Sequence, residues 1–273
     1  MPRLLSPLAL GALVLVAATQ ALAVTPAPDP WKAALSFDYN VASERFAALH
    51  AETPADARIA IAYASSLLVK QPRTESNIRT ARDLLIKARE NAPANDESAV
   101  LATYLLARVE LDHLDPAQPD SARARLEQLR KDHLAHPLAD HAAVELAYLL
   151  TYDSTGANAA AVPQVEALLA SVKDPGASRD LHSLLAGLYL RQLKNPAAAL
   201  THFVAARAVG YEQPMRNAEV DLTIGNLARE TGDTALARKH YAAFIAKAPR
   251  DVRATTVRRL LAGLDTSPNV TAR

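Results

Sequence analysis

Three histidines and an aspartate lie within one short segment, HLAHPLADH, and these side chains can bind metal ions. Neutral imidazoles and carboxylates are common ligands of Zn²⁺. The residues concerned are His133, His136, Asp140 and His141. Pro137 interrupts the segment, so the first two histidines belong to one predicted helix end and the other two residues to the next helix. Because loosely spaced ligands are a weak metal signal, we predict a polar corner between helices and no metal, with a zinc site as the alternative.

Local signatures of catalysis are missing from the sequence. It contains no G-x-S-x-G, no H-E-x-x-H and no glycine-rich phosphate loop. The absence of cysteine excludes disulfides, thiolate metal sites and a cysteine nucleophile. The 30 basic and 29 acidic residues are balanced, which disfavours a nucleic-acid partner. These features favour a non-catalytic protein without a cofactor, and an enzyme with a site in a groove is the alternative.

One pattern of residues recurs along the chain. An alanine is followed by apolar residues four and seven positions later, on one face of a helix, and then by a proline. The six alanines are Ala42, Ala81, Ala122, Ala161, Ala199 and Ala237. They are separated by 39, 41, 39, 38 and 38 residues, and so regular a step indicates an internal repeat.

A second helical segment precedes most copies of this pattern, and turn-forming residues separate the two. Each repeat is therefore predicted to be a helix hairpin, which buries one face by stacking on its neighbours. The resulting fold class is all-α, an α-solenoid of about six stacked antiparallel hairpins. Asp233 after Gly232 is expected to cap a helix, and residues 251–264 are predicted to form a C-terminal capping helix.

The last two repeats resemble the tetratricopeptide repeat, which has a small residue in its first helix, then an alanine, an aromatic residue and a closing proline. The matching residues of the last repeat are Gly225, Ala237, Tyr241 and Pro249. Those of the repeat before it are Gly187, Ala199, Phe203 and Ala206, with Pro214 displaced by three residues. The resemblance implies that helices approach closely at the small residues and that the aromatic residue fills the space between adjacent repeats.

The same resemblance implies that the first helices line a concave groove that binds an extended peptide. Arg191 and Arg229 lie in register one repeat apart, and Asn226 stands where peptide-binding members often place an asparagine for the ligand backbone. The expected apolar floor consists of Leu181, Leu184, Leu188 and Leu222. Leucines replace the lysine and further asparagine of the usual carboxylate clamp, so specificity for a C-terminal carboxylate stays open. Ordinary solvated charges are the alternative interpretation.

Aromatic residues give weaker signals. Successive first helices contain Tyr63, Tyr104, Tyr148 and Tyr189. They are interpreted as packing between helices with the hydroxyl groups in water, and an aromatic strip along the groove is the alternative. Trp31 and Phe37 are expected to pack under the first hairpin.

The N-terminus is typical of a signal peptide. Arg3 is followed by an apolar run and by Ala21-Leu22-Ala23, which predicts cleavage before Val24. The predicted divisions are therefore residues 1–23 as signal peptide, 24–30 as proline-rich linker, 31–264 as repeat domain and 265–273 as disordered tail. An uncleaved membrane anchor is the alternative, although the run is shorter than the ~20 residues of a comfortable span.

Together these features predict a periplasmic or secreted protein of a bacterial cell envelope that binds another protein or an extended peptide. A structural subunit of an outer-membrane or cell-wall assembly, without a peptide ligand, is the alternative. Stable membrane insertion after cleavage is not expected. The sequence does not indicate an oligomeric state.

Overall fold

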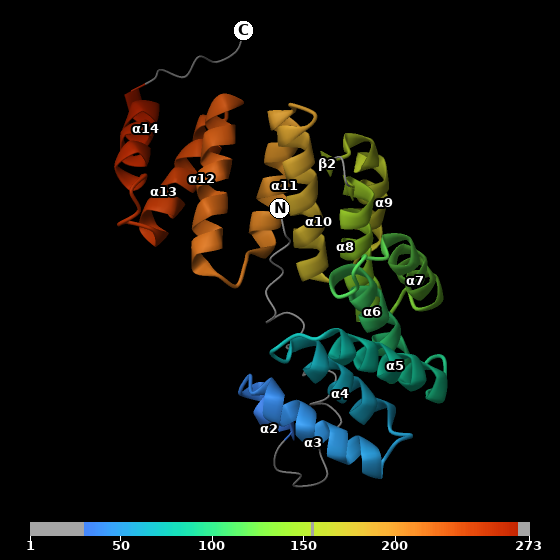
Figure 1. Cartoon of the computed structure of the whole chain (residues 1–273). Helices are drawn as coiled ribbons and strands as arrows, with labels where there is room; N and C mark the ends of the chain where they lie inside the picture. Colours follow the sequence, from blue (N-terminus) through green and yellow to red (C-terminus); the bar gives the residue numbers. More distant parts are fainter. Residues whose placement is uncertain (1–29, 154–155, 267–273) are drawn as a thin grey trace. The chain divides into compact units, whose positions relative to one another are not determined.

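The computed structural model describes residues 30–153 and 156–266, and this part of the chain is almost entirely α-helical (Figure 1). The predicted signal peptide, most of the proline-rich linker and most of the predicted tail lie outside the described residues. The chain divides into two compact units, one ending at Ala142 and the other beginning at Ala143. The division falls inside α8 (Pro137–Thr151).

Among its described residues, from 30 onward, the first unit has six helices before α8. They are α2 (Pro30–Leu35), α3 (Tyr39–Glu52), α4 (Ala57–Val69), α5 (Glu75–Asn91), α6 (Glu97–Asp112) and α7 (Pro119–Asp132).

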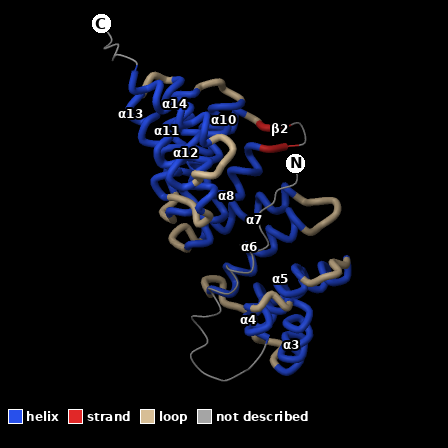
Figure 2. The backbone as a smooth tube through the Cα atoms, turned by 90° about the vertical axis from the view of Figure 1, so that its left-hand side faces the viewer, coloured by secondary structure: helices blue, strands red, loops and turns tan. Residues whose placement is uncertain are grey.

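The second unit continues from α8 through a short antiparallel pair of strands, drawn in red in Figure 2, into six more helices. These elements are β1 (Tyr152–Asp153), β2 (Gly156–Ala157), the 3-10 helix η1 (Ala159–Ala161), α9 (Val162–Ser171), α10 (Pro175–Arg191), α11 (Pro196–Val209), α12 (Pro214–Glu230), α13 (Thr234–Lys247) and α14 (Ala254–Thr266).

Within each unit, helices pack on the helices next to them in sequence, which is the arrangement of an α-solenoid. The predicted hairpins α4–α5, α6–α7, α10–α11 and α12–α13 are all present. The all-α prediction is confirmed, apart from the two short strands between α8 and α9, which the helical pattern did not indicate.

The six repeat alanines explain why the helices can approach each other. Each is at most 3% exposed, and they lie in α3, α5, α7, η1, α11 and α13. An alanine at these positions contributes only a methyl group, so a larger side chain would overpack the contact. The repeat spacing therefore marked true packing positions.

Capping side chains fix where the helices begin. As predicted, Asp233 caps α13, and its Oδ1 accepts a hydrogen bond from the backbone N–H of Leu236 at 2.9 Å. The prolines that follow the repeat pattern lie at the boundaries between repeats. Pro137 and Pro214 are the first residues of α8 and α12. Proline suits this position because the first N–H groups of a helix need no partner within the helix.

The predictions for the N-terminal aromatic residues had different outcomes. Trp31 packs edge-on against buried Phe46, with ring centroids 4.7 Å apart, as expected. Phe37 does not pack under the hairpin. It lies at a positive φ of 61° between α2 and α3 and is 60% exposed. The tight connection turns its ring outward to the edge of Tyr39.

The capping helix was predicted correctly. Val257 of α14 is buried, and Leu260, Leu261 and Leu264 pack against the core that α12 and α13 share. Arg258 and Arg259 are exposed on the other side. This helix therefore closes the apolar face of the last hairpin and presents polar side chains to water.

Candidate ligand-binding site

The predicted groove residues of α10 divide into buried leucines and one exposed arginine. Leu181, Leu184 and Leu188 belong to a core cluster with α8 and α9, and none is more than 5% exposed. Arg191 ends the helix and is exposed, and its guanidinium folds back over Gly187. A Cβ built at Gly187 would lie 2.7 Å from Nη2 of Arg191. Only the arginine of this set is thus directly available to a ligand.

The predicted residues of α12 form a connected polar group at its C-terminal half. Asn226 and Arg229 are both exposed, and both contact the hydroxyl group of Tyr241 on α13. The hydroxyl accepts from Nε of Arg229 at 3.3 Å and donates to Oδ1 of Asn226 at 2.8 Å. Leu222, the predicted floor residue of this helix, is 9% exposed and packs in the core with α13 and α14.

The ring of Tyr241 fits closely against α12 because Gly225 has no side chain. A Cβ at that glycine would lie 2.5 Å from Cδ1 of the tyrosine ring. The ring is fully buried. The expectation of a close approach at Gly225 is therefore confirmed. The resemblance implied that the aromatic ring fills the space between adjacent repeats, but in the structure the ring packs within its own hairpin.

This arrangement fixes what Asn226 and Arg229 offer to a ligand. Because the tyrosine oxygen accepts from Arg229, its hydrogen is directed at Asn226, whose carbonyl oxygen must face it. The amide Nδ2 of Asn226 and the Nη groups of Arg229 remain as donors. We name Asn226, Arg229 and Tyr241 the α12 donor group. It is suited to acceptors such as peptide carbonyls and carboxylates.

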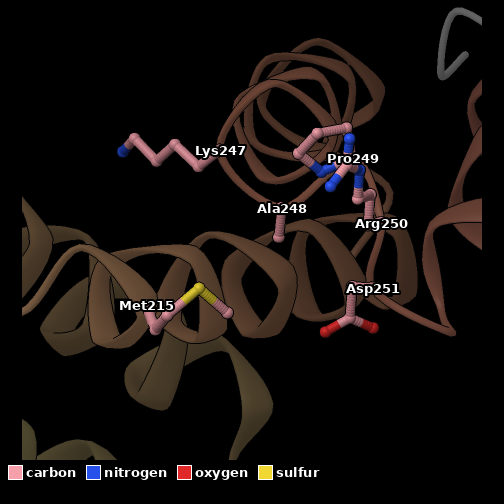
Figure 3. A pocket seen from close by; sticks show the side chains of 6 residues that line it. All are labelled: Met215, Lys247, Ala248, Pro249, Arg250 and Asp251. Atoms are coloured by element: carbon pink, nitrogen blue, oxygen red, sulfur yellow. The ribbon is translucent and has the colours of Figure 1, made fainter.

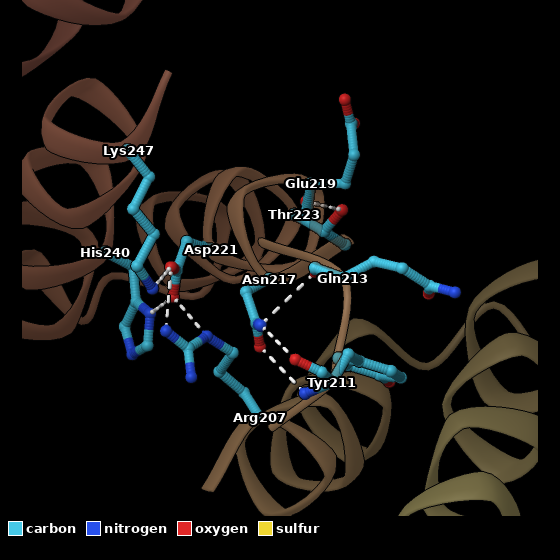
Figure 4. A network of polar contacts seen from close by, with 9 residues as sticks. All are labelled: Arg207, Tyr211, Gln213, Asn217, Glu219, Asp221, Thr223, His240 and Lys247. Carbon is cyan, nitrogen blue, oxygen red and sulfur yellow. Dashed lines mark hydrogen bonds and ion pairs between the residues drawn. The ribbon is translucent and has the colours of Figure 1, made fainter. Parts of the chain in front are cut away.

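A second polar cluster, which the sequence patterns did not indicate, lies between α11, α12 and α13 (Figure 4). Asp221 of α12 is 1% exposed and accepts from Arg207, His240 and Lys247. The distances from its carboxylate oxygens to these nitrogens are 2.9 to 3.1 Å. We name these four residues the Asp221 cluster.

The electrostatics of the Asp221 cluster favour the ionised carboxylate. Burial alone would raise the pKa of Asp221, but hydrogen bonds from Arg207, Lys247 and His240 lower it below its ordinary value of 3.8. The cluster ties three helices together. One sequence signal could have revealed it, namely a charged residue directly between the apolar residues Val220 and Leu222.

A shallow depression near the end of α13 adjoins this cluster (Figure 3). Its lining consists of Met215, Lys247, Ala248, Pro249, Arg250 and Asp251. The Lys247 ammonium already binds Asp221 at 2.9 Å, and Asp251 binds Arg253. The charges of the depression are therefore mostly engaged within the protein.

The connection between hairpins α10–α11 and α12–α13 is held by Tyr211. The guanidinium carbons of Arg179 and Arg216 lie 5.1 Å and 4.7 Å from the centre of its ring. Its hydroxyl is 2.6 Å from that of Ser183, and Asn217 binds its backbone N–H and carbonyl (Figure 4). Cation–π contacts and hydrogen bonds thus join the N-terminal halves of α10 and α12.

The histidine segment forms hydrogen bonds within the protein. Nδ1 of His136 accepts from the backbone N–H of Leu138 at the start of α8, so Nε2 donates to Glu97 at 2.8 Å.

Burial lowers the pKa of Arg130, and the nearby buried carboxylate of Asp140 opposes this shift. Among the described residues, no group of three or more histidine and acidic side chains could hold a metal ion.

The four tyrosines of the first helices have separate environments. Tyr63 is half-buried beside His50, Tyr104 is buried, Tyr148 stacks on Tyr152, and Tyr189 stacks on His202. The hydroxyl group of Tyr189 donates to Glu166 at 2.7 Å. These contacts agree with packing between neighbouring elements.

No known protein family and no curated protein matches this chain. Within the described residues, no helix is both long enough and apolar enough to cross a membrane.

Proposed function

We propose that the protein is an exported, non-catalytic, tetratricopeptide-like adaptor that binds a protein or an extended peptide through the α12 donor group. The observation that carries the proposal is the hydroxyl of Tyr241, which orients the exposed side chains of Asn226 and Arg229 at once. Side chains that are already oriented lose less conformational entropy when a ligand binds.

The chemistry of the donor group suggests an extended peptide with exposed acceptors. An asparagine amide can donate to a backbone carbonyl, and the planar guanidinium can pair with a carboxylate through two hydrogen bonds. Arg191 would contact a neighbouring part of the same ligand. The leucines that were predicted to form the floor are buried. Apolar contacts to a ligand would therefore come from the hydrocarbon parts of the exposed donor side chains and from partly exposed neighbours.

Export is part of this proposal and rests on the N-terminal sequence. The charged start, the apolar run and the small residues before Val24 support cleavage and a periplasmic or secreted location. Sequencing the N-terminus of the protein recovered from cells tests this part directly. Recovery of intact Met1 in the cytoplasmic fraction would contradict it.

Binding is tested with a peptide array, which can be screened before the natural partner is identified. The processed chain is screened against peptides that vary in acidic residues and in a free or amidated C-terminus. We expect selection of carboxylate-bearing peptides and about tenfold or greater loss of affinity in Asn226→Ala/Arg229→Ala, since each removed donor is worth ~1 kcal/mol or more.

The matched control is Arg259→Ala, which removes an exposed arginine from α14 and should bind as the unaltered protein does. Tyr241→Phe is the sharper variant, because it keeps the buried ring and removes only the hydroxyl that orients both donors. Equal binding by the double variant and the unaltered protein, at equal thermal stability, would overturn the proposed site.

A further inference from the structure

Two histidines in the α10–α11 hairpin face each other through the same ring nitrogen. His182 of α10 and His202 of α11 have their Nδ1 atoms 2.9 Å apart and their ring centroids 5.1 Å apart. Both side chains are half-buried. At this distance one ring must donate its N–H and the other must accept, because two N–H groups cannot point at each other.

The surroundings of the pair are well defined. Tyr189 stacks on His202, with ring centroids 5.4 Å apart and an angle of 14° between the planes. The tyrosine hydroxyl donates to Glu166 of α9, whose carboxylate favours a proton on His202. Burial is the main cause that lowers the pKa of both histidines, and His202 lowers that of His182 further. Glu166 opposes the effect of burial on His202.

Three protonation states of the pair follow from this geometry. With both rings neutral, one N–H···N hydrogen bond joins α10 and α11. A first proton on His202, beside Glu166, still allows that ring to donate to His182. A second proton places two N–H donors and two positive charges opposite each other, and the bond is lost.

We propose that the His182–His202 pair is a pH-sensitive latch, which joins α10 and α11 at neutral pH and releases them when both rings are protonated. The direction follows from linkage. The folded pKa values lie below the 6.5 of an unfolded histidine, so the unfolded chain takes up protons first as the pH falls. The stabilisation is therefore complete above pH 6.5 and is lost as the pH falls through the lower folded values.

The test is amide hydrogen exchange of the whole processed chain at about pH 7.5 and about pH 5, which bracket histidine titration. Rates are converted to protection factors, so that the intrinsic pH dependence of exchange is removed. We expect protection in α10 and α11 to fall up to about tenfold, because the hydrogen bond that joins the two helices through these rings is lost.

Two variants separate the latch from general acid loosening. His182→Gln keeps an amide that can form a hydrogen bond but does not titrate, so α10 and α11 should lose at most about twofold protection. His141→Gln removes a histidine of α8 and should retain the loss seen in the unaltered chain. An equal loss of protection in His182→Gln and the unaltered chain would overturn the proposal.

A measurement on the unaltered chain keeps the proposal testable if the variants fold poorly. The ring signals of His182 and His202 are followed by NMR as the pH is lowered. We expect the pair to titrate in two steps, the later one below 6.5. Two independent titrations at or above 6.5 would show that the rings do not oppose each other's protonation, and the latch would be ruled out.

Discussion

Hairpins α10–α11 and α12–α13 have helices of the same lengths, 17 and 14 residues, and matching positions are 38 residues apart. Their contacts nevertheless differ. Gly225 accepts an aromatic ring from the partner helix, whereas Gly187 is covered by an arginine of its own helix. His240 binds a buried carboxylate, whereas the matching His202 binds another imidazole. The shared pattern sets the helix spacing, and a few polar residues decide how each hairpin is held together.

The Asp221 cluster should give the largest difference between the hairpins. Asp221→Ala removes the carboxylate that Arg207, His240 and Lys247 bind. We expect a loss of ~3 kcal/mol in the free energy of unfolding. Ser183→Ala, at the matching position of α10, removes a hydrogen bond to Tyr211 and should cost ~1 kcal/mol. Urea unfolding of both variants checks this order. Similar losses would show that the cluster stabilises no more than a single hydroxyl does.

The two glycines provide the next comparison. Gly225→Ala would drive a methyl group into the buried ring of Tyr241, and we expect it to cost ~2 kcal/mol through overpacking. Gly187→Ala meets only the flexible end of Arg191, so the ~1 kcal/mol gain in helix propensity should make it neutral or stabilising. In thermal unfolding, Gly225→Ala should lower the transition temperature and Gly187→Ala should leave it unchanged or raise it. Equal destabilisation would contradict the different roles of the glycines.

The helical positions could be predicted from the sequence because their cause is local and periodic. Ala199 and Ala237 recur at a fixed step, and a small residue at each is needed wherever two helices meet. The neighbours of polar side chains have no such period. The spacing did not indicate that Arg191 would fold back on its own helix, or that His182 would contact His202 across a turn. Asn226 and Arg229 were both predicted as groove residues, but their link through Tyr241 depends on the rotation of α13.

Acid should destabilise hairpin α10–α11 before it destabilises hairpin α12–α13. As the pH falls below 6.5, the histidine pair of α10–α11 takes up protons and loses its stabilising hydrogen bond, because burial lowers the pKa of both histidines in the folded chain. The lowered pKa of Asp221 keeps its carboxylate ionised there, since its contribution is present above 3.8 and is lost only as the pH falls through the lower folded value. Hydrogen exchange at about pH 5 should therefore remain slow in α12 and α13. Simultaneous loss of protection in both hairpins would remove this distinction.

The turns inside the hairpins have different residues at the position with a left-handed backbone. Gly232 has a φ of 85° between α12 and α13, and the matching residue between α10 and α11 is Lys194, with a φ of 51°. A left-handed backbone is unfavourable for a side chain with a Cβ, so Lys194→Gly should stabilise the protein by up to ~1 kcal/mol. Gly232→Ala should destabilise it by a similar amount. Chemical denaturation measures both, and no gain from Lys194→Gly would show that this lysine is unstrained.

The smallest effects on stability are expected at the two arginines of the candidate site. Arg191 is exposed and covers only Gly187, so Arg191→Ala should change the free energy of unfolding by less than ~0.5 kcal/mol. Arg229→Ala also removes the hydrogen bond to Tyr241 and should cost slightly more, ~0.5–1 kcal/mol.

The two arginine substitutions should differ more in their effect on binding than in their effect on stability. Arg229 is oriented by Tyr241, so its removal should weaken the selected peptide about tenfold, whereas loss of Arg191 should weaken it only about threefold, as for a peripheral charge. Titration of one peptide against both single variants and the double variant measures the two contributions. An unchanged affinity in Arg191→Ala would confine the ligand to the α12–α13 hairpin, because a peptide that spans both hairpins has to pass the end of α10.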